Sequence, residues 1–565
     1  MRYLPGIALV RSYRRRWLRR DLLAGVVLTA LLVPQGMAYA ELAGLPPAAG
    51  LYATMVPLLA YAVFGPSRIL ILGPDSAVAP VVAAAIIPIA GADMDRRAAL
   101  AAFLAILVGG LMVIGGLTGV AFVTDLLSLP VRIGYLIGIA VTVIVSQLPA
   151  LIGYESTASG LLDEVRALPD GLADADALTM AIGVSSLALI LVMKAFAPKV
   201  PGVLIAVVAS TGVVGALGLA DRLPTVGRLP QGLPSLVVPT PGDADLVHLA
   251  LVAVAIALVA FADTSVLSRS YATRYREDVD QNSELVGLGA ANLLTGFFQG
   301  FPISSSSSRT PAAEAAGART QLAGASAAVC LGAVLVFGAG LFRNLPSATL
   351  AAIVVAAMIS LIDVAAVRRL YGAHRMDFAL AATAFAAVAA LGVLRGVGAG
   401  VAVSLAAFLW RSWHPHDATL GRADHVKGYH DVARYPDAKL PPGLVLYRFD
   451  APLFFANAGV FRARVLALAK ARQPRWIVIA AEPITDVDST SAEMLVALHD
   501  ELQALGVELA FAELKDHVTD TLRRFGFIER VGADRFYLTL GVAVRAYVTA
   551  VGTPWRDWED EPNAT

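Results

Sequence analysis

Between Leu22 and about Trp410 the chain is a succession of apolar runs separated by short polar or glycine- and proline-rich stretches. Hydrophobic residues make up 57% of the 565 residues, well above their share in soluble globular domains. A helix needs about 20 mostly apolar residues to cross a bilayer, and broken segments need fewer. The pattern therefore predicts an α-helical polytopic membrane protein surrounded by lipid.

The apolar runs fall into two sets of seven, which gives fourteen expected membrane segments. The first set lies within residues 21–220 and the second within 246–412. Their approximate ranges are 22–42, 50–65, 75–90, 98–117, 120–149, 177–197 and 200–218, followed by 246–268, 284–300, 304–317, 320–342, 346–364, 376–393 and 396–412. Arginines cluster in segment 1–20, so the positive-inside rule places the N-terminus in the cytoplasm. An even number of crossings returns the C-terminus to that side of the cytoplasmic (inner) membrane.

The third segment of each set is short and opens on polar or helix-breaking residues. These openings are Gly73-Pro74-Asp75-Ser76 and the stretch 302–308, which contains five consecutive serines. Such a polar stretch survives in a membrane only inside the protein or beside a water-filled cavity. Short, proline-interrupted segments at matching places in two halves point to a transporter site between inverted repeats. Two ordinary helices with polar caps remain the alternative.

Several longer stretches carry a family resemblance. They are DLLAG at 21–25, VPQGMAYA at 33–40, LPPAAGLY at 45–52, FGPSR at 64–68 leading to Gly73-Pro74, NLLTG at 292–296, Ser308-Arg309, and TQLAG at 320–324. In this order they resemble the sulfate permease (SulP) family of anion transporters. The resemblance implies fourteen segments as two inverted repeats of seven, a core domain that rocks against a gate domain, a homodimer, and a cytoplasmic regulatory domain at the C-terminus.

The residues around 304–309 suit an anion. A helix that begins inside the membrane has unpaired N–H groups and a partial positive charge at its N-terminus, and two such ends can cradle an anion. The hydroxyls of residues 304–308 add neutral donors, and Ser306, Ser307 and Ser308 are the candidate site residues among them. Arg309 would stand in the first turn of a helix, where the dipole disfavours a cation by roughly 0.3 to 1 kcal/mol. Either a bound anion or an acidic residue in a structural ion pair should compensate it.

The opening of segment 75–90 and the first segment supply further candidates. Asp75 is either a helix cap or a group that takes a proton when the anion binds. By resemblance, Ser76 and Ala77 contact the substrate through a hydroxyl and the backbone. Gln35 and Tyr39 flank Pro34 and Gly36, which we expect to interrupt the first helix. Both side chains either face the cavity or form hydrogen bonds that fix helix packing.

Asp263 follows the apolar run 249–261, where an ionised carboxylate costs roughly 2.5 to 3.5 kcal/mol. It must therefore be paired, protonated or bound to a cation. In the family a carboxylate at the matching position, often glutamate, is implicated in ion coupling. The resemblance makes Asp263 the expected coupling group for a proton or sodium ion. A structural salt bridge with Arg269 or Arg309 is the alternative.

After Trp410 the apolar runs shorten to strand length. Residues 413–442 read as a polar linker, 443–550 as an α/β domain and 551–565 as a tail. The expected strands are 444–449, 453–456, 476–481 and 507–511, and the expected helices are 459–472, 489–505, 515–525 and 539–550. Their order resembles the domain shared by sulfate transporters and anti-sigma factor antagonists (STAS), which could bind a cytoplasmic regulatory partner. We expect Ser489 to be a helix N-cap rather than a phosphorylation site.

These features favour a secondary active transporter of a small anion, either sulfate, bicarbonate or a dicarboxylate. A permease for nucleobases or other neutral solutes and a membrane-tethered STAS signalling protein are the alternatives. The 44 basic and 44 acidic residues balance, so no net charge favours nucleic acid. The sequence has neither metal-spaced His/Cys clusters nor a phosphate-binding Gly-rich loop, so we expect no enzyme and no cofactor beyond the coupling proton or sodium ion.

Overall fold

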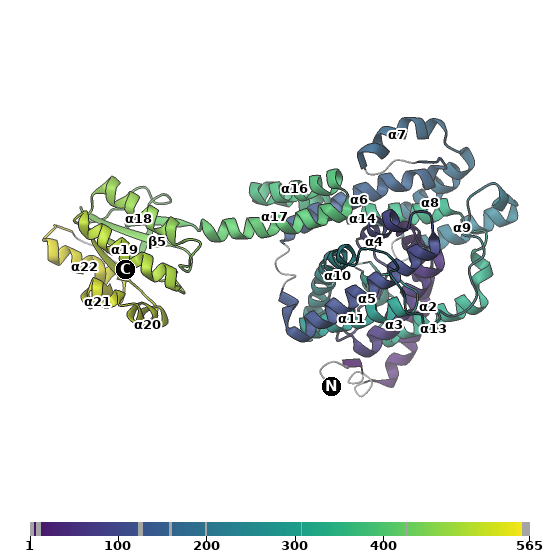
Figure 1. Cartoon of the computed structure of the whole chain (residues 1–565), viewed down its shortest axis with the longest axis horizontal. Coiled ribbons are helices and arrows are strands. Elements are labelled where there is room, and N and C mark those ends of the chain that lie inside the picture. The colour runs from purple at the N-terminus through teal and green to yellow at the C-terminus, as the bar shows by residue number, and fades with distance from the viewer. Residues whose placement is uncertain are drawn as a thin grey trace. The chain divides into compact units, whose positions relative to one another are not determined.

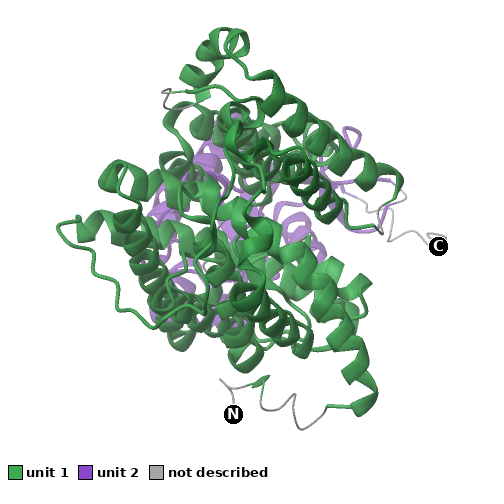
Figure 2. Cartoon of the chain, turned by 90° about the vertical axis from the view of Figure 1, so that its right-hand side faces the viewer, with its two compact units in different colours: residues 1–405 green, residues 406–565 purple. Residues whose placement is uncertain are grey.

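The computed structural model describes residues 5–6, 13–122, 128–156, 161–197, 200–306, 308–424 and 426–555. The chain forms two compact units, residues 1–405 and 406–565, which are coloured separately in Figure 2. The described part of the first unit is helical apart from two short strands, whereas the second unit is built on a mixed sheet.

A helix occupies each of the fourteen predicted membrane segments (Figure 1). Their bounds are α2 (Leu18–Leu42), α3 (Pro47–Phe64), α4 (Ala79–Ala90), α5 (Met94–Thr118), α6 (Leu129–Ile152), α8 (Ala177–Phe196), α9 (Gly202–Ala216), α10 (Leu246–Tyr275), α11 (Gln281–Phe297), α12 (Arg309–Ala315), α13 (Leu322–Phe337), α14 (Ser347–Leu361), α16 (Arg375–Leu391) and α17 (Val393–Trp413). In the described residues, eight helices are long and apolar enough to cross a membrane. Two further helices, α7 (Leu161–Ala173) and α15 (Val364–Ala373), were not predicted and precede the sixth segment of each set.

The helices of the first unit pack as two bundles. The first bundle contains α2 to α5 and α10 to α13, and the second contains α6, α8, α9, α14 and α16. Figure 1 shows α11 beside α5 in the first bundle and α14 beside α6 in the second. Glycines allow α5 and α11 to approach closely, because a Cβ on Gly109 would lie only 2.5 Å from the backbone nitrogen of Leu293. Contacts of α2 with α14 join the bundles.

Two short strands pair at the place where the sequence predicts the site. Strand β1 (Leu72–Gly73) pairs antiparallel with β2 (Ser304–Ser305), and Gly73 lies opposite Ser304. The predicted helices 75–90 and 304–317 are therefore too long, because α4 begins only at Ala79 and α12 covers only seven residues. Pairing the two extended segments satisfies buried backbone groups that lipid could not satisfy.

The first membrane helix also differs from its prediction. Helix α2 is continuous from Leu18 to Leu42 and contains Pro34 in its interior. The expected interruption at Pro34 and Gly36 is therefore wrong. Tertiary packing outweighs the lost backbone hydrogen bond, because α2 is enclosed by α3, α13 and α14.

The second unit contains a six-stranded sheet in the order β4-β3-β5-β6-β7-β8. Its strands are β3 (Asp417–Arg422), β4 (Tyr429–Asp431), β5 (Leu444–Phe449), β6 (Trp476–Ala480), β7 (Glu508–Ala512) and β8 (Phe536–Tyr537). Its helices are α18 (Ala458–Arg472), α19 (Ser489–Ala504), α20 (Asp516–Arg524), α21 (Phe527–Val531) and α22 (Leu540–Val551). Strands β5 to β8 are parallel, whereas β3 and β4 are antiparallel additions at one edge.

Two sequence-based expectations for this unit are wrong. Residues 413–442 are not only a linker, because β3 and β4 lie within them and β3 pairs with β5. The buried, alternating Ala418 and Leu420 anchor β3 to the sheet. The expected strand at 453–456 is reduced to a single bridge between Leu453 and Val487.

The start of α19 differs from the prediction by one residue. Asp488, rather than Ser489, is the N-cap, and its carboxylate accepts a hydrogen bond of 2.8 Å from the backbone N–H of Ser491. The same carboxylate accepts a bond of 2.7 Å from the N–H of Phe455. Ser489 is the first helical residue and is exposed.

Candidate functional site

A cavity of about 400 Å³ lies within the first unit and is bounded by α2, α4, α6, α8, α10, α12 and α14 or the turns next to them. Its polar lining comprises Gln35, Tyr39, Asp75, Ser76, Arg132, Lys194, Asp263, Ser270, Ser305, Ser306, Ser308 and Ser360, together with the apolar Ala77. Every predicted site residue except Ser307 and Arg309 is in this lining. Ser307 lies outside the described residues, and Arg309 lies directly behind the lining, beside Asp75.

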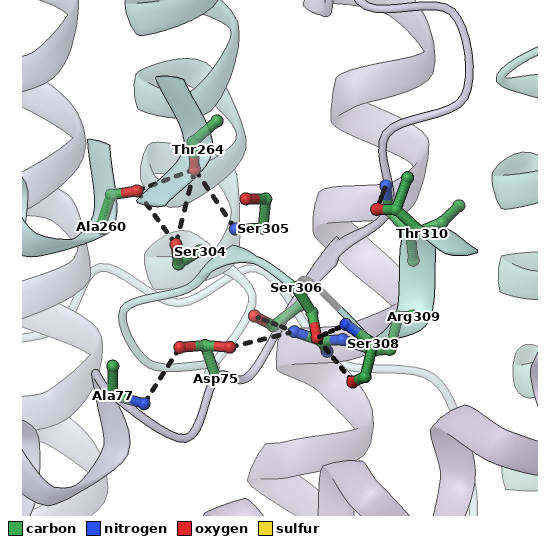
Figure 3. Close-up of polar contacts among 12 residues, drawn as sticks. Asp75, Ala77, Ala260, Thr264, Ser304, Ser305, Ser306, Ser308, Arg309 and Thr310 are labelled. Atoms are coloured by element: carbon green, nitrogen blue, oxygen red, sulfur yellow. Dashed lines mark hydrogen bonds and ion pairs between the residues drawn. The ribbon is translucent and has the colours of Figure 1, made fainter. Parts of the chain in front are cut away.

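Asp75 caps the turn before α4 and also lies near Arg309, while its uptake of a proton on anion binding stays a prediction. One oxygen, Oδ2, accepts a hydrogen bond of 3.0 Å from the backbone N–H of Ala77, as a capping carboxylate does. The other, Oδ1, lies 3.9 Å from a terminal guanidinium nitrogen of Arg309 (Figure 3). The pairing of β1 with β2 brings these residues together across more than two hundred positions of sequence.

Arg309 is the largest fully buried side chain near the cavity, with 1% of its surface exposed. Its guanidinium donates to the carbonyl oxygen of Gly73 at 3.3 Å, and its Nε has no hydrogen-bond partner among the described residues. A Cβ on Gly73 would lie 2.6 Å from a terminal guanidinium nitrogen, so a larger residue here would displace the guanidinium. Asp75 is the negative group that the sequence required, but 3.9 Å is longer than a hydrogen bond.

Ser305, Ser306 and Ser308 line the cavity from β2 and the turn that follows it. The hydroxyls of Ser306 and Ser308 lie 3.0 Å apart, and the backbone N–H of Ser308 donates to Ser306 Oγ at 3.3 Å. Ser305 was not among the predicted site residues, yet its hydroxyl is buried in the cavity lining without a partner in the described part of the chain. Membership in the five-serine run was the signal that could have found it.

Gln35 reaches the cavity from α2, and its Oε1 also has no partner in the described ranges. Buried polar atoms are nearly always hydrogen-bonded, so an orphaned group in a native structure requires an explanation. Gln35 Oε1, Ser305 Oγ and Arg309 Nε are three such atoms in or beside one cavity. Their clustering marks this cavity as the candidate site for a polar solute.

Helix α10 holds β2 in place. Ser304 Oγ donates to the carbonyl oxygen of Ala260 at 3.0 Å, and the N–H of Ser305 donates to Thr264 Oγ1 at 3.3 Å (Figure 3). Thr264 itself donates to Ala260 at 2.7 Å. The position of the serines therefore depends on the helix that also carries Asp263.

Asp263 pairs with a residue that sequence reasoning missed. Its Oδ1 lies 2.8 Å from a guanidinium nitrogen of Arg132 in the first turn of α6. The partners suggested by the sequence, Arg269 and Arg309, were wrong. A lone arginine at the start of the apolar run 129–152 was the available signal, since such a residue usually pairs or faces a cavity.

The chemistry of the site is that of reversible binding. It offers hydroxyl and backbone donors, one buried guanidinium and two carboxylates, each beside an arginine. In the part of the chain that the structure describes, no group of three or more His, Cys, Asp and Glu residues could hold a metal ion. Helix α12 has only seven residues, so charge and hydroxyl donors contribute more to the site than its small dipole.

Comparison with known proteins identifies the chain's relatives. The family model "Sulfate permease family" matches residues 18–384. The chain belongs to the sulfate permease family. The "STAS domain" model matches residues 435–543, so this family member is a multi-pass membrane transporter with a C-terminal α/β domain rather than an enzyme.

Individual relatives cover almost the whole chain. A probable sulfate transporter of Mycobacterium tuberculosis is 42% identical over 548 residues, which are 96% of this chain and 98% of the relative. Sulfate transporter 4.1 of the Arabidopsis thaliana chloroplast is 32% identical and covers 96% of this chain and 82% of its own length. The structure of the murine Solute Carrier 26 member A9 anion transporter has a TM-score of 0.88 at 22% identity, covering 97% and 94% of the two chains, and so shares the fold.

Proposed function

We propose that this sulfate permease family member is a secondary active transporter of a small oxyanion, with sulfate as the first candidate, that works by alternating access. The observation that carries the proposal is the cavity in which serine hydroxyls and unpartnered polar atoms converge, with Arg309 directly behind its lining. Two relatives named as sulfate transporters support sulfate, although the same donors suit bicarbonate or a dicarboxylate. A neutral nucleobase would gain no charge attraction from Arg309, whereas an anion would.

Binding an anion changes the charge balance of the site. Arg309 lies close to Asp75, so an arriving anion would compete with Asp75 for the guanidinium. A carboxylate beside a bound anion is unfavourable unless it is neutralised or moves away. We propose that the anion enters together with a cation, either a proton or sodium, and that Asp263 is the group that binds this cation.

The orientation follows from the N-terminal arginines. If they hold the N-terminus in the cytoplasm, the C-terminal ends of α8 and α14 lie on the cytoplasmic side. Lys194 and Ser360 stand at these ends, hydrogen-bond to each other and line the cavity. We therefore propose that the protein lies in the inner membrane and that this end of the cavity opens to the cytoplasm.

Transport in proteoliposomes tests the proposal. Labelled sulfate should enter vesicles preloaded with unlabelled sulfate, and an inward gradient of either protons or sodium should drive its accumulation. Asp263→Asn should keep the exchange but lose accumulation, because an amide cannot carry the coupling cation. Absence of sulfate exchange in the wild-type protein would contradict sulfate as substrate, and accumulation by Asp263→Asn would contradict the coupling role.

A further inference from the structure

The ion pair between Arg132 and Asp263 connects the two bundles of the first unit. Helix α6, which carries Arg132, packs mainly against α8, α14 and α16 of the second bundle. Helix α10, which carries Asp263, packs mainly against α5, α11 and β2 of the first. Both side chains line the cavity, with exposed fractions of 22% and 18%. A movement of one bundle against the other acts directly on this pair.

The surroundings of Asp263 contain few other charges. Arg132 and Tyr135 face it from α6, and Asp75 is the nearest further charge, from the turn before α4. In the described ranges Arg132 is the one basic side chain within 4 Å of the carboxylate. The hydroxyl of Tyr135 is buried and has no hydrogen-bond partner in these ranges. Lys194 of α8 lines the same cavity.

Arg132, at 2.8 Å from Oδ1, and a bound cation compete for the charge of one carboxylate. A proton on either oxygen of Asp263 removes the charge that attracts Arg132, and a sodium ion at the carboxylate would be repelled by the guanidinium. The carboxylate therefore has two competing partners, a diffusible cation and the side chain of Arg132. The partner present in the structure is Arg132.

We propose that Arg132 is a built-in competitor of the coupling cation, which replaces the cation at Asp263 and so favours its release. This inference rests on the proposed function of Asp263 as the coupling group. When no cation is bound, Arg132 pairs with the negative charge of Asp263, which would otherwise be unpaired in the cavity. An incoming cation must displace Arg132, and the displacement frees the two bundles to move.

The test is the cation dependence of sulfate uptake by purified full-length protein in proteoliposomes. Arg132→Gln removes the competitor, so half-maximal uptake should need at least a tenfold lower proton or sodium concentration. This magnitude is expected because an adjacent opposite charge typically changes the protonation equilibrium of an acid by one to three powers of ten. Net uptake at saturating cation should slow because release is impaired, whereas sulfate exchange should persist. Arg132→Lys should restore the wild-type cation dependence.

Two further variants separate competition from a structural role. Arg96→Gln breaks the exposed pair of Arg96 with Asp243, which lies outside the cavity. It should leave the dependence of sulfate uptake on cation concentration (the cation curve) unchanged. The double variant Arg132→Gln, Asp263→Asn carries no unpaired charge, so it should fold even if Arg132→Gln does not. It should exchange sulfate without any cation dependence, and a cation-dependent double variant would overturn the inference.

Other outcomes distinguish this inference from the proposed function. An unchanged cation curve in Arg132→Gln, or a loss of sulfate affinity with the cation curve intact, would overturn the competitor role alone. Sulfate exchange without any proton or sodium dependence in the wild-type protein would overturn the coupling role of Asp263, and the inference with it.

Discussion

At the scale of single residues, the site contains two arginine–aspartate pairs. Arg309 lies near Asp75, and Arg132 lies near Asp263. The two pairs differ in geometry, because the first spans 3.9 Å and the second 2.8 Å. The proposed role of Arg309 in binding a solute rests on the loose pair, whereas the tight pair occupies Asp263.

Replacing Arg309 by glutamine tests the first pair. A hydrogen bond to a charged group contributes about 1.5 to 3 kcal/mol, so Arg309→Gln should weaken sulfate binding by roughly tenfold or more. The apparent affinity of labelled sulfate uptake measures the effect. Arg274→Gln is the matched control, because Arg274 pairs with Glu314 at an exposed position outside the cavity. Equal affinities of the two variants would remove Arg309 from the site.

At the scale of elements, short irregular segments place the chemistry and long helices support it. Strands β1 and β2 contain two residues each, yet their pairing decides which side chains meet in the cavity. In the second unit, the Asp488 carboxylate joins α19 to Phe455 in the loop before α18. Burial disfavours ionisation of Asp488, but these hydrogen bonds outweigh it and lower the pKa of the carboxyl.

Removing this cap should loosen the start of α19. Loss of an N-cap typically costs about 1 kcal/mol, so Asp488→Ala should speed amide exchange in the first turn roughly fivefold. Hydrogen–deuterium exchange of the full-length protein measures this. Ser489→Ala is the neighbouring control and should have no effect, because Ser489 is exposed and is not the cap. The reverse result would restore Ser489 as the N-cap.

At the scale of the whole molecule, each unit carries its own core and its own polar features. The cavity is lined by residues between Gln35 and Leu361, all within the first unit. The second unit has separate apolar clusters on both faces of its sheet. Binding and stability can therefore be tested in each unit separately.

Truncation tests the independence of the cavity. A chain that ends after Trp413 should still exchange labelled sulfate in proteoliposomes, because every residue of the cavity lining remains. Rates should stay within a few fold of the full-length protein. A folded truncated protein that no longer exchanges sulfate would show that the second unit is required for transport itself.

Acid should destabilise the second unit through His499. This side chain is buried in α19, its Nδ1 has no partner in the described residues, and burial lowers its pKa. The folded unit therefore holds neutral histidine, whereas the unfolded chain takes up a proton below about pH 6.5. Stability is fully present above that pH and declines as the pH falls below it. Calorimetry of the full-length protein should show this decline, and His499→Leu should reduce it.

Family membership and the helical membrane fold with a STAS domain were predictable from the sequence and are confirmed. The inverted relation of the two halves stays a prediction. The sequence also pointed to Gln35, Tyr39, Asp75 and the serines, which line one cavity. Apolar length and local motifs suffice for this, because a bilayer imposes its thickness and tolerates polar stretches only in protected places.

Only the tertiary structure decided which charges and strands meet. Three contacts join segments that are distant in sequence or lack a strong local pattern. They are the pair of Arg132 with Asp263, the pairing of β1 with β2, and the pairing of β3 with the sheet. Local propensity cannot specify such pairs, because one carboxylate has several possible arginines along the chain. Packing of the two bundles places Arg132, rather than Arg269 or Arg309, beside Asp263.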